Sequence, residues 1–99
     1  MKVVYTAAAQ NDLREIGEWL AARYPAVAPH VERRIREIVV HIARWPESGP
    51  RSAGRDGVRV VPLGRYPYRI FYRVGADEVE ILHIHHAARR PWDEQAQPE

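Results

Sequence analysis

Histidine and arginine side chains whose types and spacing could support chemistry gather in the last third of the chain. Residues 83–86 read His-Ile-His-His, and Arg69 and Arg73 lie upstream of them. A histidine can accept or donate a proton near neutral pH. An arginine can hold a phosphate or a carboxylate through two parallel hydrogen bonds. These residue types are suited either to acid–base chemistry beside a phosphate or to recognition of an acidic partner.

A three-stranded antiparallel ribbon from residue 58 onwards is predicted to position these side chains. The segment 66–74 is rich in aromatic and β-branched residues, which favour strands, and 75–77 has the composition of a turn. Alternation places Arg69, Phe71 and Arg73 on one face of the first long strand. On the returning strand, strict alternation groups four residues on one face, with Leu82 and Ile84 on the other: Val79, Ile81, His83 and His85.

Two helices are predicted between a short strand at 2–5 and this ribbon. Thr6 is the expected N-cap of the first helix, and prolines at 25 and 46 end the two helices. Apolar residues recur at helical spacing in both segments, which predicts one buried stripe on each. Trp19 and Trp45 are expected to pack in the core or within the helical hairpin, and Gly17 is expected to allow close approach of the neighbouring helix.

The predicted order is β-α-α-β-β-β, an α+β fold in which a helical hairpin packs on one face of an antiparallel sheet. We expect one domain over residues 1–92 and a polar tail over 93–99. Because the hairpin can cover only one face, Phe71, Val79 and Ile81 are predicted on the uncovered face. Leaving them in water forgoes about 5–8 kcal/mol. This predicts either a partner on that face or cover by the tail or the loop 46–57.

Composition restricts the class of protein further. The chain has 99 residues, 45% of them hydrophobic and 28% charged, a net charge of +2 and no cysteine. The absence of cysteine excludes a disulfide framework and thiolate metal sites. No apolar run has the length of a membrane span and no signal-peptide pattern is present, so we expect a cytoplasmic protein without membrane contact.

A metal site can be imagined at His83 and His85, whose side chains are predicted on one face, about 7 Å apart along the strand. No carboxylate or cysteine is placed by the sequence to complete it. We therefore expect no metal and no cofactor, and a contact across the strands or with a partner, or proton transfer, as the role of these histidines.

Several stretches together resemble the RelE/ParE superfamily of toxins from type II toxin–antitoxin modules. They are Tyr68–Val74, Val79–His86 and the basic exit Ala87–Trp92, with 5–13 matching the family's first strand and helix and 45–47 the end of its second helix. The resemblance covers almost the whole chain. It implies a helical hairpin on a sheet, and a cognate antitoxin whose C-terminal segment wraps the toxin in a hetero-oligomer.

The superfamily implies two activities. RelE-like members cleave mRNA in the ribosome without a metal, and this resemblance would make Arg69, His85 and His86 the catalytic residues. ParE-like members inhibit DNA gyrase by binding. The C-terminal tyrosine of many nucleases is missing, and Arg55 and Arg59 stand where those enzymes often have lysine or glutamate. These departures favour the ParE-like branch. A non-toxic co-repressor is the third possibility.

The resemblance also gives expectations for binding residues. Six residues are predicted to contact the antitoxin: Arg69, Phe71, Arg73, Val79, Ile81 and His83. Three residues of the basic exit are predicted to contact the target, which is gyrase or the ribosome with its mRNA: Arg89, Arg90 and Trp92. For Arg69 and Arg73, contact with an acidic antitoxin, contact with nucleic-acid phosphate and simple solvation all remain open.

Overall fold

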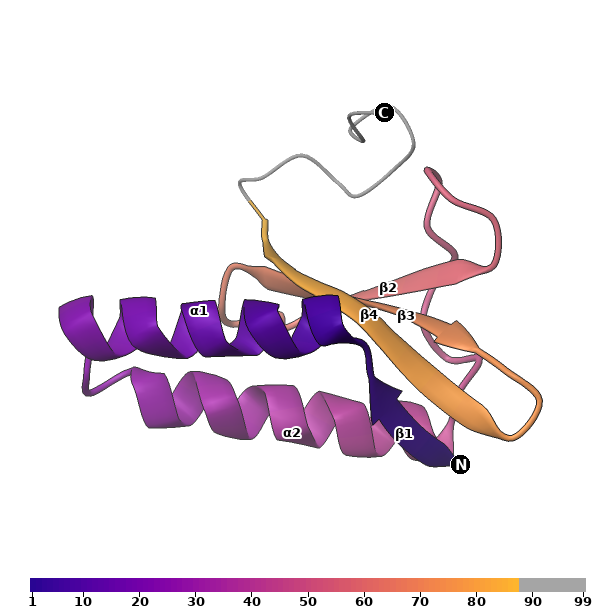
Figure 1. Ribbon diagram of the computed structural model, residues 1–99, viewed down its shortest axis with the longest axis horizontal. Coiled ribbons are helices and arrows are strands. Elements are labelled where there is room, and N and C mark those ends of the chain that lie inside the picture. The colour runs from indigo at the N-terminus through magenta and orange to yellow at the C-terminus, as the bar shows by residue number, and fades with distance from the viewer. Residues whose placement is uncertain (88–99) are drawn as a thin grey trace.

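The computed structural model describes residues 1–87 and shows two helices lying side by side against a four-stranded sheet (Figure 1). The elements follow the predicted order: β1 (Lys2–Tyr5), α1 (Ala7–Arg23), α2 (Ala28–Arg44), β2 (Val58–Pro62), β3 (Tyr68–Val74) and β4 (Glu78–His86). Neither helix in this part of the chain is long and apolar enough to cross a membrane. The predicted boundary at residue 92 and the tail beyond it lie outside the described residues.

Both helices begin as the sequence predicts. The Thr6 side chain caps α1 by accepting a hydrogen bond from the Ala9 amide at 3.0 Å. Helix α2 carries a proline in its first turn, where no intrahelical amide is lost. Its apolar stripe is buried against the sheet: Val31, Ile35, Ile38, Val39 and Ile42.

Three expectations for the helices are wrong. Trp19 is 43% exposed and Trp45 is 56% exposed, so neither belongs to the core. Trp19 instead packs beside Tyr24 and under the Arg23 guanidinium at the end of α1. A Cβ atom added to Gly17 would meet nothing within 4 Å, so this glycine does not serve a close helix contact.

The sheet has the order β1-β4-β3-β2 and is mixed, whereas an antiparallel sheet was predicted. Strands β2, β3 and β4 form the expected antiparallel ribbon. Strand β1 pairs in parallel with β4, from Lys2 opposite Glu78 to Tyr5 opposite Ile81. Both helices separate β1 from the ribbon along the chain, and this connection is long enough for parallel pairing. Strand β1 therefore joins β4 although the two strands lie at opposite ends of the described chain.

A β-bulge in β4 changes which face its side chains occupy. Phe71 lies opposite His83 while Tyr72 lies opposite Ile81, so Leu82 has no residue directly across from it. The strict alternation predicted for 79–85 therefore breaks between Leu82 and His83, and the faces predicted for Val79, Ile81 and Leu82 are wrong. Val79, Ile81 and Ile84 share the helix-covered face, and Leu82 belongs to the cluster on the other face.

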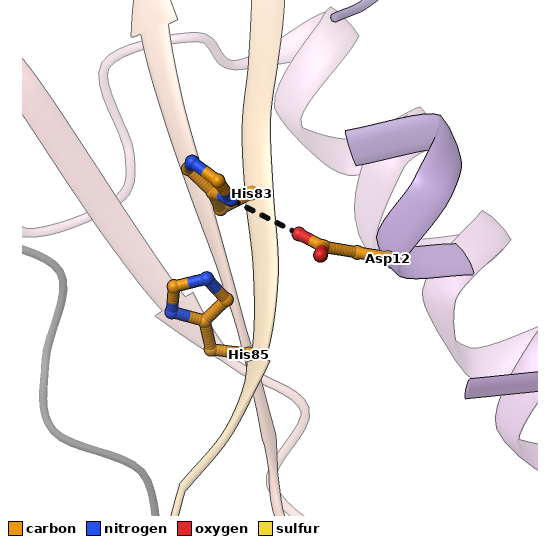
Figure 2. A group of neighbouring side chains, drawn as sticks. All are labelled: Asp12, His83 and His85. Atoms are coloured by element: carbon orange, nitrogen blue, oxygen red, sulfur yellow. Dashed lines mark hydrogen bonds and ion pairs between the residues drawn. The ribbon is translucent and has the colours of Figure 1, made fainter. Parts of the chain in front are cut away.

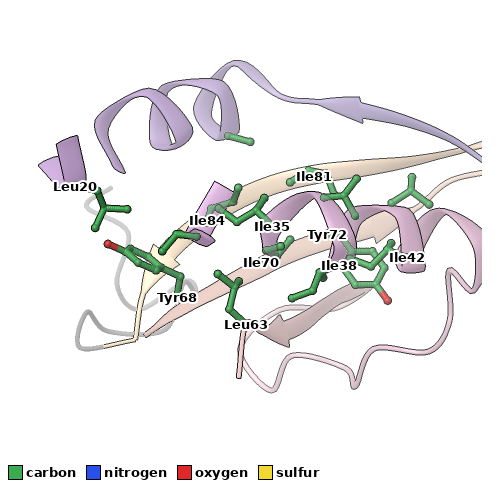
Figure 3. Close-up of a cluster of buried hydrophobic side chains, with 14 residues drawn as sticks. Leu20, Ile35, Ile38, Ile42, Leu63, Tyr68, Ile70, Tyr72, Ile81 and Ile84 are labelled. Atoms are coloured by element: carbon green, nitrogen blue, oxygen red, sulfur yellow. The ribbon is translucent and has the colours of Figure 1, made fainter. Parts of the chain in front are cut away.

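The main core lies between the helices and the sheet (Figure 3). Ile81, Ile70 and Tyr72 from the sheet are all 0% exposed and meet the apolar stripes of α1 and α2 there. A separate cluster on the opposite face consists of Val58, Phe71 and Leu82. Burial raises the pKa of the Tyr5 and Tyr68 phenols, because it disfavours their charged form.

The first part of the loop 46–57 is fixed to the sheet by buried polar contacts. The Tyr72 hydroxyl donates to the Pro46 carbonyl at 2.7 Å and accepts from the Gly49 amide at 3.0 Å. The Arg59 guanidinium donates to the Gly49 carbonyl at 2.7 Å. A Cβ at Gly49 would lie 2.6 Å from the Tyr72 oxygen, so the loop passes where only glycine fits without adjustment.

Candidate functional site

The face of the sheet that the helices leave uncovered carries most of the side chains suited to chemistry or recognition. Register places Arg69 opposite His85, Phe71 opposite His83, and Arg73 opposite Glu80. Because Arg69, Phe71 and Arg73 alternate with core residues of β3, their partners on β4 share the same face. The grouping of Arg69, Arg73, His83 and His85 on one face, expected from the sequence, is confirmed.

Beyond the end of β1, the backbone of β4 forms hydrogen bonds with Thr6, the N-cap of α1, and with Asp12 of α1. The Thr6 amide donates to the Ile81 carbonyl at 3.0 Å, and the Thr6 hydroxyl donates to the Leu82 carbonyl at 2.9 Å. One turn further along α1, the Asp12 carboxylate accepts from the Ile84 amide at 2.9 Å. The backbone groups of β4 that have lost a strand partner are thus satisfied by α1, which fixes this helix against the bulged part of the strand.

Asp12, His83 and His85 form a polar cluster beside this junction (Figure 2). His83 Nδ1 lies 3.1 Å from Asp12 Oδ2, and the same oxygen receives the Ile84 amide. The two imidazole rings have centroids 4.7 Å apart and project from β4 to the same side, while Asp12 reaches them from α1. The cluster is largely shielded, since the Asp12 and His83 side chains are 13% and 23% exposed.

The three residues predicted for RNA cleavage do not all lie on one face of the sheet. Arg69 and His85 lie across from each other, and Arg69 Nη2 donates to the Ala87 carbonyl at 3.2 Å. His86 lies on the opposite face, where its ring meets the edge of Tyr68 at a centroid distance of 5.3 Å. His85 is itself 9% exposed and its ring lies 5.6 Å from that of Phe71. Adjacent positions on a strand point to opposite faces, which separates His85 from His86.

Arg73 is the most exposed basic residue of the predicted antitoxin set. Its guanidinium forms an ion pair with Glu80 at 2.9 Å, and the two side chains are 49% and 35% exposed. Such a pair contributes at most about 1 kcal/mol. It can therefore be exchanged for a contact with an acidic partner at small cost.

The apolar members of the predicted antitoxin set are not exposed. Val79 and Ile81 are each 0% exposed within the helix-side core, because the bulge begins only after them. Phe71 is on the predicted face, but it is 1% exposed and packs with Val58 and Leu82. The prediction that these three side chains lie on the uncovered face is therefore wrong for Val79 and Ile81 and confirmed for Phe71.

Exposed large apolar side chains of the described residues lie on the helical layer and at the N-terminus instead of on the sheet. They are Met1, Trp19, Tyr24, Val27, Val40 and Trp45. The helical layer also contains an apolar hollow between α1 and α2, whose lining includes Leu13, Ile16, Gly17, Leu20 and Ala28. Arg89, Arg90 and Trp92, the predicted target-binding residues, lie outside the described residues.

Asp12 is the site residue that sequence reasoning missed. Its place on α1 resembles that of any polar residue on the solvent side of a helix, and the pairing with His83 spans 71 positions of sequence. The statement that no carboxylate is placed near the histidines is therefore wrong. Only a prediction of β1 in parallel beside β4 would have brought the start of α1 next to His83.

Comparison with known proteins assigns this fold to a family. Residues 3–91 match the model of the family described as the ParE toxin of the type II toxin–antitoxin system parDE. The chain therefore belongs to the ParE toxin family, which confirms the resemblance of its sequence to the RelE/ParE superfamily. A relative from Sinorhizobium fredii, named "Putative toxin Y4kP", is 36% identical over 86 residues, which is 87% of this chain and 88% of that protein.

Solved structures of toxins share the fold. The chromosomal ParDE system of P. aeruginosa contains a chain with 27% identity and a TM-score of 0.75, covering 87% of this chain and 95% of that one. The isolated E. coli RelE toxin has 16% identity and a TM-score of 0.60, covering 90% and 86%. The RelBE2 toxin–antitoxin complex of Mycobacterium tuberculosis has 23% identity and a TM-score of 0.58, covering 86% and 95%. The last two are similar to this chain in fold alone.

Proposed function

We propose that this toxin acts in the cytoplasm by binding and inhibiting DNA gyrase, and that a cognate antitoxin neutralises it. The observation that carries the proposal is the match of residues 3–91 to the ParE toxin family. The higher TM-score to the ParDE chain, 0.75 against 0.60 for RelE, supports the same branch.

The geometry of the uncovered face supports a binding toxin over a nuclease. Cleavage of RNA without a metal requires a general base, a general acid and a cation close to one phosphate. Of the three residues that the RelE resemblance supplies for these roles, His86 lies on the helix-covered side with Tyr68, while His85 is largely buried. A substrate reaching Arg69 would therefore meet one of the two predicted proton-transfer groups at most.

One observation favours the nuclease as a second candidate. His83 shares a face with Arg69 and His85, and its Nδ1 is oriented by the Asp12 carboxylate at 3.1 Å. An oriented imidazole beside an arginine is a plausible acid–base arrangement, so this alternative is included in the test below. The third alternative, a non-toxic co-repressor, does not require these residues for its function.

For the antitoxin we propose two areas of contact. Arg69, Arg73 and His83 offer positive or hydrogen-bonding groups to an acidic segment on the sheet. The hollow between α1 and α2, about 280 Å³ in volume, offers apolar surface for the side chains of an amphipathic segment. We therefore place the apolar contact with the antitoxin on the helices instead of on the sheet, because Val79, Ile81 and Phe71 are already buried in this chain.

The test measures both activities with the same purified chain. We expect loss of supercoiling when the toxin is added to DNA gyrase with relaxed plasmid and ATP, and intact mRNA in a translation extract at the same toxin concentration. A double variant, Arg69→Ala with His85→Ala, is expected to inhibit gyrase as the unchanged toxin does, once circular dichroism has verified its fold.

Each alternative has its own outcome. Cleaved mRNA without any effect on gyrase, abolished in the double variant, would establish the nuclease and refute the proposal. Absence of both effects, together with harmless induced expression, would favour the co-repressor. Co-expression with the product of the adjacent short reading frame is expected to restore growth if that product is the antitoxin.

A further inference from the structure

Three side chains at the edge of β4, two from the uncovered face of the sheet and one from α1, present donor atoms that a single ion could join. Asp12, His83 and His85 each offer one ligand atom, and these atoms all lie within 4.8 Å of one another. The donors come from two elements, α1 and β4, so the cluster exists only in the folded chain (Figure 2).

We propose that Asp12, His83 and His85 form a binding site for a divalent transition-metal ion, with Zn²⁺ as the best-suited ion. Two imidazole nitrogens and one carboxylate oxygen form a donor set that Zn²⁺ takes in many proteins. Mg²⁺ and Ca²⁺ require oxygen ligands almost exclusively, so the two histidines disfavour them.

The distances fit this ion with little rearrangement. A tetrahedral zinc ion lies about 2.0–2.1 Å from nitrogen and oxygen ligands, which places the ligand atoms about 3.3 Å apart. Asp12 Oδ2 and His83 Nδ1 are already 3.1 Å apart. The remaining donor, from His85, lies within 4.8 Å of both, so it has to move closer by at most about 1.5 Å to reach the ligand spacing of a tetrahedral ion.

The cluster is held in place before any ion arrives. The Asp12 carboxylate receives the Ile84 amide at 2.9 Å, a contact that would orient the ligand from outside the coordination shell. Both histidines stand on β4, where their backbone positions are paired with Phe71 and Arg69 of β3. Low exposure of the cluster strengthens an electrostatic interaction, while the 23% exposure of His83 leaves a route for the ion.

Three protein ligands leave one tetrahedral position open. In the isolated chain we assign that position to water, as in zinc sites with three protein ligands. An imidazole binds a metal ion in its neutral form, so the titration below is made above neutral pH. The site is independent of the proposed gyrase inhibition, and its test needs neither gyrase nor antitoxin.

The experiment is calorimetric titration of Zn²⁺ into the full chain, freed of metal with EDTA, at pH 7.5. We expect one ion per chain, a higher thermal unfolding temperature with Zn²⁺, and reversal by EDTA. Co²⁺ in place of Zn²⁺ should give the intense visible absorption of a tetrahedral site. Asp12→Asn, which keeps an acceptor for the Ile84 amide, and His85→Ala are each expected to weaken binding by about tenfold or more.

The controls are two histidines outside the cluster. His86→Ala removes the sequence neighbour on the opposite face, and His41→Ala removes an exposed histidine of α2. Both variants are expected to bind as the unchanged chain does. Absence of stoichiometric binding, or binding that persists in folded Asp12→Asn and His85→Ala, would overturn the proposal. Loss of binding in either control would do the same, because it would place the ion elsewhere.

Discussion

The two faces of the sheet differ in how they are buried and in what they can do. On the helix side, one continuous apolar cluster joins both helices to β3 and β4. On the opposite side, the buried apolar cluster formed by the described residues consists of Val58, Phe71 and Leu82, and it borders the polar group of Asp12, His83 and His85. The difference shows that the first face provides cohesion, whereas the second can hold polar side chains in fixed positions.

The bulge at Leu82 marks the boundary between these roles within a single strand. Before it, Val79 and Ile81 face the helices, and after it His83 and His85 face the other side. One additional residue therefore allows β4 to supply the core with its first half and the polar cluster with its second half. Bulges near functional sites commonly redirect side chains in this way.

The largest effect is expected when Ile81 and Leu82, neighbours in sequence, are each replaced by alanine. Ile81→Ala removes a side chain that is 0% exposed in the large core and is expected to cost about 3–5 kcal/mol of unfolding free energy. Leu82→Ala, at 6% exposure in the small cluster, should cost about 2 kcal/mol. Urea unfolding followed by circular dichroism measures both.

Val40→Ala is the matched control for this pair, because Val40 is 67% exposed on α2. It should change the unfolding free energy by less than about 0.5 kcal/mol. An equal or larger loss for Leu82→Ala than for Ile81→Ala would contradict the assignment of cohesion to the helix-side face.

An intermediate effect is expected at Gly49, where the loop passes the Tyr72 hydroxyl. The added Cβ of Gly49→Ala would lie 2.6 Å from the Tyr72 oxygen and 2.9 Å from a Val61 methyl, and Tyr72 is held by two hydrogen bonds. Such crowding is expected to cost about 1–3 kcal/mol. The same substitution at Gly17, where nothing lies within 4 Å, should stabilise the chain by about 1 kcal/mol.

Thermal and urea unfolding of the two glycine variants measure this contrast. Equal changes in unfolding free energy, of the same sign at both positions, would contradict the tight packing of the loop against Tyr72. Opposite signs would sharpen the comparison, since they separate crowding at a fixed loop from helix propensity at an open position.

The smallest effect is expected above pH 10 and concerns Tyr5 and Tyr68 on the helix side. Burial raises the pKa of both phenols, whereas in the unfolded chain a tyrosine ionises near pH 10. Stability is therefore fully present below pH 10 and is lost as the pH rises through the folded-state pKa. Replacing both by phenylalanine should flatten this part of the stability profile.

Tyr24→Phe serves as the control for the alkaline profile, because Tyr24 is 54% exposed. Urea unfolding between pH 8 and pH 11 should give the same slope for this variant as for the unchanged chain. If the double variant loses stability with pH as steeply as the unchanged chain, burial of the two phenols is not the cause of alkaline sensitivity.

Much of the architecture was predictable because it depends on local patterns. The Thr6 cap, the helix ends near prolines and the turn after Val74 follow from side-chain and backbone preferences of a few residues. The faces of β3 followed from simple alternation, which holds along the entire strand. The placement of Arg69 and Arg73 on the uncovered face belongs to this predictable part.

The parts that could not be predicted depend on contacts between distant segments. The parallel pairing of β1 joins Lys2 to Glu78, and no local pattern specifies the direction of such a pair. The bulge at Leu82 reverses the facing of every later residue in β4. The adjacent apolar residues Ile81 and Leu82 interrupt the alternation there, but a strand buried on both faces would show the same pattern. Asp12 becomes part of a site only because α1 follows β1 to the edge of β4.

The sequence by itself determined the elements, their order and the likeness to a toxin family, because those depend on local preferences and on residue types along the chain. The tertiary structure decided that Val79 and Ile81 are core and that Asp12 meets His83. The physical reason is that strand direction and register are set by packing of the whole chain, and a shift of one residue moves each side chain to the other face.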